Sequence, residues 1–305
     1  MEYSTIDKNT DPKENVPLQK ISYQDYLSSL KGSLDKYPNL FRKSGSVCLL
    51  TLDIKGRPSV LMTKRSNTIS HAGKYVFPGG GIKQGLDRST LDAAKRELVE
   101  ETKISSNTIS IMDEEKQGES VPKTYLTSVL GTDKKTGDSN TRYWIMDIFT
   151  ARIPFQTLSK ASFKHTEVDK YDLLPLTPLF VELGLVKSNE IDISEEPLVT
   201  VGTKQEINKM PEGTEVIVDI PLVTITEPNG NSWTIEKATA YHIINLCKQF
   251  SRHEYLIQGI EKSMDTELKK TVIKNGTKVL EEMPVIGGLI ALGRIIKSLI
   301  KKFQK

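Results

Sequence analysis

Cysteine and histidine are scarce in this chain of 305 residues, which contains two cysteines and four histidines. Cys48 and Cys247 lie far apart, and neither belongs to a Cys-x-x-Cys pair. This pattern argues against a disulfide framework and against a zinc site built on cysteine, and it favours an intracellular, reducing environment.

The N-terminal segment lacks an apolar core, and the chain as a whole lacks a strong charge imbalance. Residues 1–20 are polar throughout, which predicts a flexible leader and no signal peptide or membrane span there. A net charge of +3 gives no reason to expect a nucleic-acid partner. A hydrophobic content of 37% with 27% charged residues is typical of a soluble globular protein.

The first half of the chain combines a helical pattern with several strand patterns. Residues 21–41 carry weak helical spacing that ends near a turn-prone Tyr-Pro-Asn sequence. Residues 46–53 and 58–66 predict two strands joined by a hairpin, because apolar and β-branched runs flank a glycine turn. Residues 143–153 alternate well enough to predict a central strand.

Three carboxylates stand at helical spacing in the segment 90–104. Glu97, Glu100 and Glu101 occupy positions i, i+3 and i+4, so a helix would project all three from one side. Because like charges repel, we expect a divalent cation between them, and hard oxygen ligands suit Mg²⁺ or Mn²⁺.

The opposite side of the same helix is apolar. Leu91, Ala94 and Leu98 have the spacing of a stripe that is buried against a sheet. Ser89, followed three residues later by Asp92, predicts that the helix begins near residue 90. One face therefore packs, and the other is free to bind a ligand.

A glycine run precedes this helix, and the two together resemble the Nudix box. Gly79, Gly80 and Gly81 allow sharp turns and offer N–H groups to an anion. The sequence from Arg96 to Glu101, with Ile104, is similar to the second half of the box. That family cleaves nucleoside diphosphates that are linked to another moiety.

Three positions depart from the family pattern. Lys103 stands where the box ends in glycine, Ile82 stands where the first glycine belongs, and Arg88 stands where the early glutamate belongs. Asp87 is adjacent and is the candidate replacement for that glutamate, with Gly80 or Gly81 in the role of the first glycine.

The resemblance implies an α+β protein, an α/β/α sandwich with a mixed sheet. It also implies that Glu97 and Glu101 are the best pair of metal ligands, with Glu100 as a third ligand or a base. Arg96 would brace the loop by pairing with Asp87. The backbone of Gly79–Gly81 would approach the metal or a phosphate closely.

The sequence before the box is similar to the coenzyme A diphosphatase branch of the family. The similarity rests on residues 61–66, 71–73 and 76–80, with small differences in spacing. It implies that Lys64 and Arg65 reach substrate phosphates; the alternative for each is a solvated charge at a strand end. Glu167 is implied to assist the metal or the attacking water, or else it is an ordinary surface carboxylate.

The second half of the chain carries no motif that we recognise. We divide the chain into a leader (1–20), a Nudix domain with an N-terminal helix (21–187), an accessory α+β region (188–283) and a basic amphipathic helix (284–305). Strand-rich 215–226, a turn at 228–231 and a strand and helix over 233–250 are expected in the accessory region. The terminal helix would bind an anionic membrane surface or pack against protein.

Two hypotheses of function follow. The first is a diphosphohydrolase that depends on Mg²⁺ or Mn²⁺ and favours coenzyme A, with nucleotide sugars, dinucleotides or RNA caps as other substrates. The second is a catalytically silent Nudix module that binds a ligand or forms a membrane-tethered scaffold. The three glutamates favour the enzyme, whereas Lys103 and the missing early glutamate favour the silent module. The sequence leaves the oligomeric state open.

Overall fold

The computed structural model describes residues 18–261, except residues 54, 68–71, 113–114, 117–118, 121, 133–138, 160–165, 251 and 253. Most of the predicted leader and all of the predicted terminal helix (284–305) lie outside these residues. Within the described part of the chain, the longest and most apolar helices fall short of what a membrane crossing requires.

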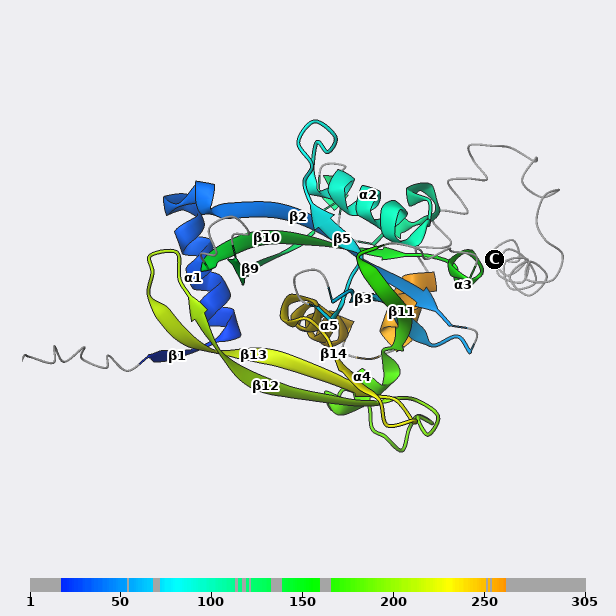
Figure 1. The fold of residues 1–305 in the computed structure, drawn as a ribbon. Coiled ribbons are helices and arrows are strands. Elements are labelled where there is room, and N and C mark those ends of the chain that lie inside the picture. The colour runs from blue at the N-terminus through cyan, green and yellow to red at the C-terminus, as the bar shows by residue number, and fades with distance from the viewer. Residues whose placement is uncertain are drawn as a thin grey trace, which may run out of the picture. The chain divides into compact units, whose positions relative to one another are not determined.

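The larger of the two main sheets has eight strands and mixed directions (Figure 1). Its main path runs β11-β3-β2-β10-β6, where β2 and β10 are parallel and the other neighbours are antiparallel. The strands of this sheet are β2 (Phe41–Leu52), β3 (Pro58–Arg65), β4 (Tyr75–Val76), β5 (Gly79–Gly81), β6 (Ser110–Ile111), β9 (Lys123–Thr132), β10 (Ser139–Arg152) and β11 (Val168–Pro175). The predicted α+β class with a mixed sheet is confirmed.

The predicted hairpin joins β2 to β3. The Asp53 carboxylate accepts hydrogen bonds from the backbone N–H groups of Lys55 and Arg57 at 2.8 and 2.9 Å. Gly56 has a φ of 77°, a conformation that residues with a Cβ rarely adopt. The turn therefore depends on one aspartate and one glycine, and both are local in the sequence.

Helix α2 (Thr90–Thr102) packs against β2, β5 and β10. Ala94 and Leu98 are fully buried in one cluster with Val47 and Phe149 of the sheet, and Leu91 is partly buried against the same cluster. The predicted apolar stripe is confirmed, and it fixes which side of the helix faces the sheet.

A second sheet of four strands lies on the far side of helix α5 (Lys237–Phe250), which contacts both β13 and β9 (Figure 1). β13 is central: it pairs with β1 in parallel and with β12 and β14 in antiparallel fashion. The strands are β1 (Gln19–Ser22), β12 (Leu198–Lys209), β13 (Glu215–Thr226) and β14 (Ser232–Thr234).

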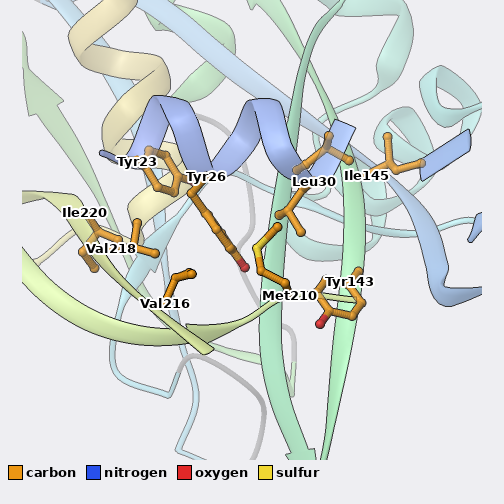
Figure 2. Close-up of a cluster of buried hydrophobic side chains, with 10 residues drawn as sticks. Tyr23, Tyr26, Leu30, Tyr143, Ile145, Met210, Val216, Val218 and Ile220 are labelled. Atoms are coloured by element: carbon orange, nitrogen blue, oxygen red, sulfur yellow. The ribbon is translucent and has the colours of Figure 1, made fainter. Parts of the chain in front are cut away.

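Helix α1 (Tyr23–Lys36) joins the two sheets through a buried cluster (Figure 2). Tyr26 and Leu30 are fully buried against Val218 of β13 and Ile145 of β10. The Tyr26 hydroxyl lies 2.5 Å from the Ser128 hydroxyl, so its polar end has a partner within the core.

The remaining elements are short. They are the 3₁₀ turns η1 (Pro38–Leu40) and η2 (Ser106–Thr108), the strands β7 (Glu115–Lys116) and β8 (Glu119–Ser120), and the helices α3 (Phe155–Leu158) and α4 (Thr177–Glu182).

The described residues up to Ile257 belong to one compact unit, and a second unit begins at Gln258. The predicted leader is wrong for Gln19 and Lys20, because both lie in β1 and pair with Val216 and Ile217. The boundary between residues 187 and 188 stays a prediction.

Candidate active site

Helix α2 places two of the three predicted carboxylates on its buried side. Its first turn is capped by the Ser89 hydroxyl, which accepts a hydrogen bond from the Asp92 N–H at 3.1 Å, as the sequence predicted. Glu97 is only 9% exposed and Glu101 only 3% exposed. Because α2 rests on β5, these two side chains are enclosed between the helix and the glycine strand.

Arg96 lies at the centre of the charged groups. Its guanidinium donates to the Asp87 carboxylate at 2.9 and 3.0 Å and to the carbonyl of Gly81 at 3.0 Å. It also donates to Glu97 at 2.6 Å and to Glu100 at 3.1 Å. The pairing with Asp87 was predicted, and the hydrogen bonds to Arg96 hold the pKa of that carboxyl below its usual value.

Glu100 differs from the other two glutamates, and here the sequence-based argument is wrong. Burial opposes its ionisation, but Lys83 at 3.1 Å and Arg96 together hold its pKa below the ordinary value. The positive charges of Lys83 and Arg96 therefore offset part of the repulsion among the three carboxylates. The sequence argument omitted Lys83, which the loop brings to the helix although it is 17 residues away in the chain.

Glu101 is the most buried of the three glutamates, and positive groups compensate its charge only in part. Its Oε2 atom is buried and has no hydrogen-bond partner among the described residues. Burial raises its pKa to about 8, and the charge of Glu97 adds to this shift. Arg65 and the backbone N–H of Gly79 act in the opposite direction.

The glycine strand β5 approaches the helix so closely that side chains do not fit. A Cβ on Gly80 would lie 2.5 Å from Oε1 of Glu97. Gly79 is paired with Ser46 of β2, and a Cβ there would lie 2.2 Å from the Ser46 hydroxyl. The small size of these glycines is therefore required by the protein's own packing, whatever they do for a ligand.

The structure brings Arg65 and Glu167 near Glu101. β3 and β11 pair Arg65 with Val168, and the Ser66 N–H donates to the Glu167 carbonyl at 3.0 Å. The charges of both side chains act on the pKa of Glu101: Arg65 lowers it, and Glu167, which is exposed, raises it.

Lys64 faces away from this group. Successive side chains of a strand point to opposite faces, so Lys64 and Arg65 lie on opposite sides of the sheet. Its cross-strand partner is Lys170, whose ammonium pairs with Asp172 at 3.0 Å. The structure therefore brings Arg65, but not Lys64, to the carboxylates of α2.

Lys103 ends the helix in a left-handed conformation, with a φ of 58° and a ψ of 13°. Its N–H donates to the Val99 carbonyl at 3.0 Å. Glycine is the residue best suited to such a helix end, because it has no Cβ to crowd the carbonyl. The replacement of the family's glycine by Lys103 therefore strains the backbone, and it removes no ligand, because glycine has no side chain.

We tested whether these residues suit a divalent cation. Among the described residues, no group of three or more His, Cys, Asp or Glu side chains is already arranged around a common centre. Two buried carboxylates, one with an unpartnered oxygen, nevertheless supply the hard donors that Mg²⁺ and Mn²⁺ prefer. The donor set fits such an ion at Glu97 and Glu101, and Glu100 joins only by leaving Lys83 and Arg96.

A cavity of about 380 Å³ lies elsewhere, beside β11 and β13. Asp172, Glu227 and Trp233 are among its lining residues, and the predicted site residues are not. We therefore place the candidate active site at α2 and β5 and not in this cavity.

Known proteins resemble part of this chain. Residues 42–188 match the family model described as NUDIX domain. An uncharacterized Nudix hydrolase, NudL, of Photorhabdus laumondii subsp. laumondii is 32% identical over 95 residues, which are 30% of this chain and 50% of that protein. Nudix hydrolase 3 of Caenorhabditis elegans is 37% identical over 91 residues, 28% of this chain and 36% of that protein. The chain thus spans about half the length, or less, of these two relatives.

Solved structures show low overall similarity. The NUDIX domain of Shewanella oneidensis NrtR, complexed with ADP ribose, is 19% identical with a TM-score of 0.32, covering 52% of this chain and 96% of that chain. A MutT/nudix family protein from Enterococcus faecalis is 11% identical with a TM-score of 0.38, covering 80% of each chain. The match to the NUDIX domain model covers residues 42–188, slightly less than half of the chain, and makes this segment similar to the Nudix family.

Proposed function

We propose that this chain is a metal-dependent hydrolase that cleaves the pyrophosphate bond of a nucleoside diphosphate derivative. The NUDIX domain over residues 42–188 supports this proposal, as do relatives whose names describe Nudix hydrolases. The grouping of Glu97, Glu101, Arg65 and Glu167 supports it independently of those names.

One observation carries the proposal: the buried Oε2 atom of Glu101, which has no hydrogen-bond partner among the described residues. Glu101 lies in the last turn of α2, where the helix dipole is negative and where this helix has no basic residue. Its Oε2 atom is buried and unpartnered, and Glu97 lies one turn away. A position that is unfavourable for folding in three separate ways is best explained by a cation that binds there.

Glu97 and Glu101 would hold the metal ion, with Glu100 or Glu167 as a further ligand or base. When bound, Mg²⁺ or Mn²⁺ supplies charge neutralisation to phosphoryl oxygens and a more acidic water. Arg96 holds Glu97 at 2.6 Å and fixes the loop through Asp87, so it orients one ligand and prevents the loop from moving. Arg65 offers a planar fork of N–H donors to a phosphate near Glu101.

The substrate class is proposed at two levels. A small nucleotide-type molecule suits the domain family, and coenzyme A is favoured because residues 61–66 and 76–80 resemble the coenzyme A diphosphatase branch. Nucleotide sugars, dinucleotides and RNA caps are the competing substrates. Binding of residues 284–305 to an anionic membrane is a further proposal, based on their sequence pattern alone.

The test is hydrolysis by the purified chain of a panel containing coenzyme A, a nucleotide sugar and a dinucleotide, with Mg²⁺, with Mn²⁺ and with a chelator. We expect metal-dependent release of the two phosphorylated products and a loss of at least about 100-fold in Glu101→Gln. Glu195→Gln is the matched control, because Glu195 is 77% exposed and pairs with Lys55 away from the site. Equal turnover by both variants would refute the assignment.

A second candidate function is a ligand-binding module without catalysis. The hydrogen bonds of Glu100 to Lys83 and Arg96 favour it, because they occupy a carboxylate that hydrolysis would use. This alternative predicts that the panel compounds bind, as measured by calorimetry, and remain intact after long incubation with either metal.

A further inference from the structure

The C-terminal part of the compact unit carries no motif, yet it is bonded to the segment that leads into the glycine strand. Ile235, just after β14, forms a parallel bridge with Tyr75 of β4. The next residue, Glu236, donates its backbone N–H to the Tyr75 carbonyl at 2.9 Å. Two segments that are about 160 residues apart in the chain are thus joined through their backbones.

Aromatic side chains reinforce the same junction. The ring centroids of Tyr75 and Trp233 lie 3.8 Å apart, with an angle of 32° between the ring planes. The Tyr75 hydroxyl donates a hydrogen bond to the Asp172 carboxylate at 2.5 Å. Phe77, which is 3% exposed, meets the edge of His242 on α5 at 5.5 Å. Tyr75 and Phe77 are therefore held from the side of β14 and α5.

This segment continues directly into the site. The carbonyl of Pro78 accepts a hydrogen bond from the Val47 N–H at 2.9 Å, and Gly79 then begins β5. Gly79 donates its N–H to Glu101, and the carbonyl of Gly81 accepts from Arg96 at 3.0 Å. Only three residues lie between Tyr75 and Gly79, the glycine that touches Glu101, so the Tyr75–Trp233 contact is close to β5 along the chain.

We propose that β14 and the start of α5 form a brace that positions the glycine strand against Glu97 and Glu101, with Trp233 as its main positioning residue. The proposal rests on the proposed function, because the site that it positions is the metal site. It gives the motif-free region a role in the chemistry of the NUDIX domain. Trp233 touches Tyr75 and acts on the site through the backbone of 75–81.

The test compares Trp233→Leu, which removes the aromatic contact, with Trp233→Phe, which keeps it. In the full chain, we expect Trp233→Leu to bind Mn²⁺ about 3- to 10-fold more weakly and to lose a similar factor in kcat with little change in KM. Hydrogen exchange of peptides that cover 75–81 should accelerate by a similar factor. Trp233→Phe should restore all three readouts.

The matched control is Phe41→Leu, which removes another aromatic contact, with Tyr143 at 5.4 Å, away from the junction. It should leave Mn²⁺ affinity and the exchange of 75–81 as in the wild type. Wild-type Mn²⁺ affinity and exchange in folded Trp233→Leu would overturn the brace. A wild-type chain that binds no Mn²⁺ would instead overturn the proposed function, and the exchange of 75–81 would still decide whether Trp233 holds the strand.

Discussion

Two buried glutamates, one in each half of the molecule, show how differently the two halves treat charge. Glu236 directly precedes α5, and its carboxylate accepts hydrogen bonds from the N–H groups of Ala238 and Thr239 at 2.8 and 3.1 Å, where the helix dipole is favourable. Glu101 ends α2, where the dipole is unfavourable, beside another carboxylate. Each carboxylate has one buried oxygen without a hydrogen-bond partner among the described residues, but only Glu101 also faces an unfavourable dipole and a neighbouring carboxylate.

The groups that surround the two glutamates also differ in charge. Around α2, the Arg96 guanidinium donates hydrogen bonds to Asp87, Glu97 and Glu100, and Glu101 is not among these partners. Around α5 and α1, neutral pairs such as Tyr26 with Ser128 and Tyr125 with His242 are buried together with the charged side chains of Glu236 and Lys237. The proposed cation site therefore differs from this region in its excess of carboxylates over cationic side chains.

Removal of Arg96 should have the largest effect, because it breaks the charge balance of the first region. Arg96→Met leaves Asp87 and Glu97, 3% and 11% exposed in their side chains, without their cation. We expect a loss of about 3–5 kcal/mol in the free energy of unfolding, measured with urea. Arg88→Met, at an exposed position of the same loop, should stay within about 0.5 kcal/mol of the wild type; an equal loss in both would show that the loop, and not the pairing, is sensitive.

Two glycine-to-alanine substitutions should change the stability in opposite directions, one through close packing and the other through helix propensity. Gly80→Ala places a methyl group 2.5 Å from Oε1 of Glu97, so it should cost about 1–3 kcal/mol and lower turnover. Gly32→Ala, in α1, meets no atom within 4 Å and should stabilise by about 1 kcal/mol. Thermal unfolding of both variants checks the opposite signs; a neutral Gly80→Ala would show that β5 is not held against Glu97.

The burial of a neutral histidine, His242, in the second region should appear as a pH dependence of stability. Burial lowers the pKa of His242 to about 3, whereas an unfolded histidine has a pKa near 6.5. The unfolded chain therefore binds the proton first, and the stability that is fully present above pH 6.5 is lost as the pH falls. Between pH 7 and pH 5 this residue should account for about 2 kcal/mol.

Urea unfolding at the two pH values measures this loss, and the His242→Gln variant serves as the control. The variant should be less stable at pH 7, because the bond to the Tyr125 hydroxyl at 3.0 Å is altered, but its stability should fall less between pH 7 and pH 5. The same pH slope in both proteins would assign the effect to other groups.

The smallest effect on stability is expected at the end of α2, where variants of Lys103 separate the cost of backbone strain from any role in hydrolysis. Lys103→Gly should relieve the left-handed strain and stabilise by about 0.5–1 kcal/mol. Lys103→Ala removes the bond from the ammonium to the Glu100 carbonyl at 2.9 Å without relieving the strain, so it should not stabilise. If neither variant changes hydrolysis, the departure of Lys103 from the family pattern has no functional meaning.

Local features of the fold were predictable from the sequence, since turn and cap chemistry depends on neighbours in the chain. The hairpin at Gly56, the Ser89 cap of α2 and the stripe of Ala94 and Leu98 are examples. Strand β13 also has the predicted bounds, Glu215–Thr226. The alternating pattern and the β-branched residues of this segment were enough to predict the strand.

Contacts between distant segments could not be predicted. The pairing of β1 with β13 and the bridge between Tyr75 and Ile235 leave no periodic signal in the sequence. At the site, spacing placed Glu97, Glu100 and Glu101 on one helix, but it could not show that Lys83 reaches Glu100. That contact depends on how the loop folds back onto α2.

The central claim is that Glu101, with its buried and unpartnered Oε2 atom, exists to hold a divalent cation, and Mn²⁺ binding tests it most directly. A titration followed by electron paramagnetic resonance should show saturable binding to the wild type and to Glu195→Gln, and a loss of at least about 100-fold in affinity for Glu101→Gln. Equal Mn²⁺ affinity in the wild type and Glu101→Gln would contradict the account.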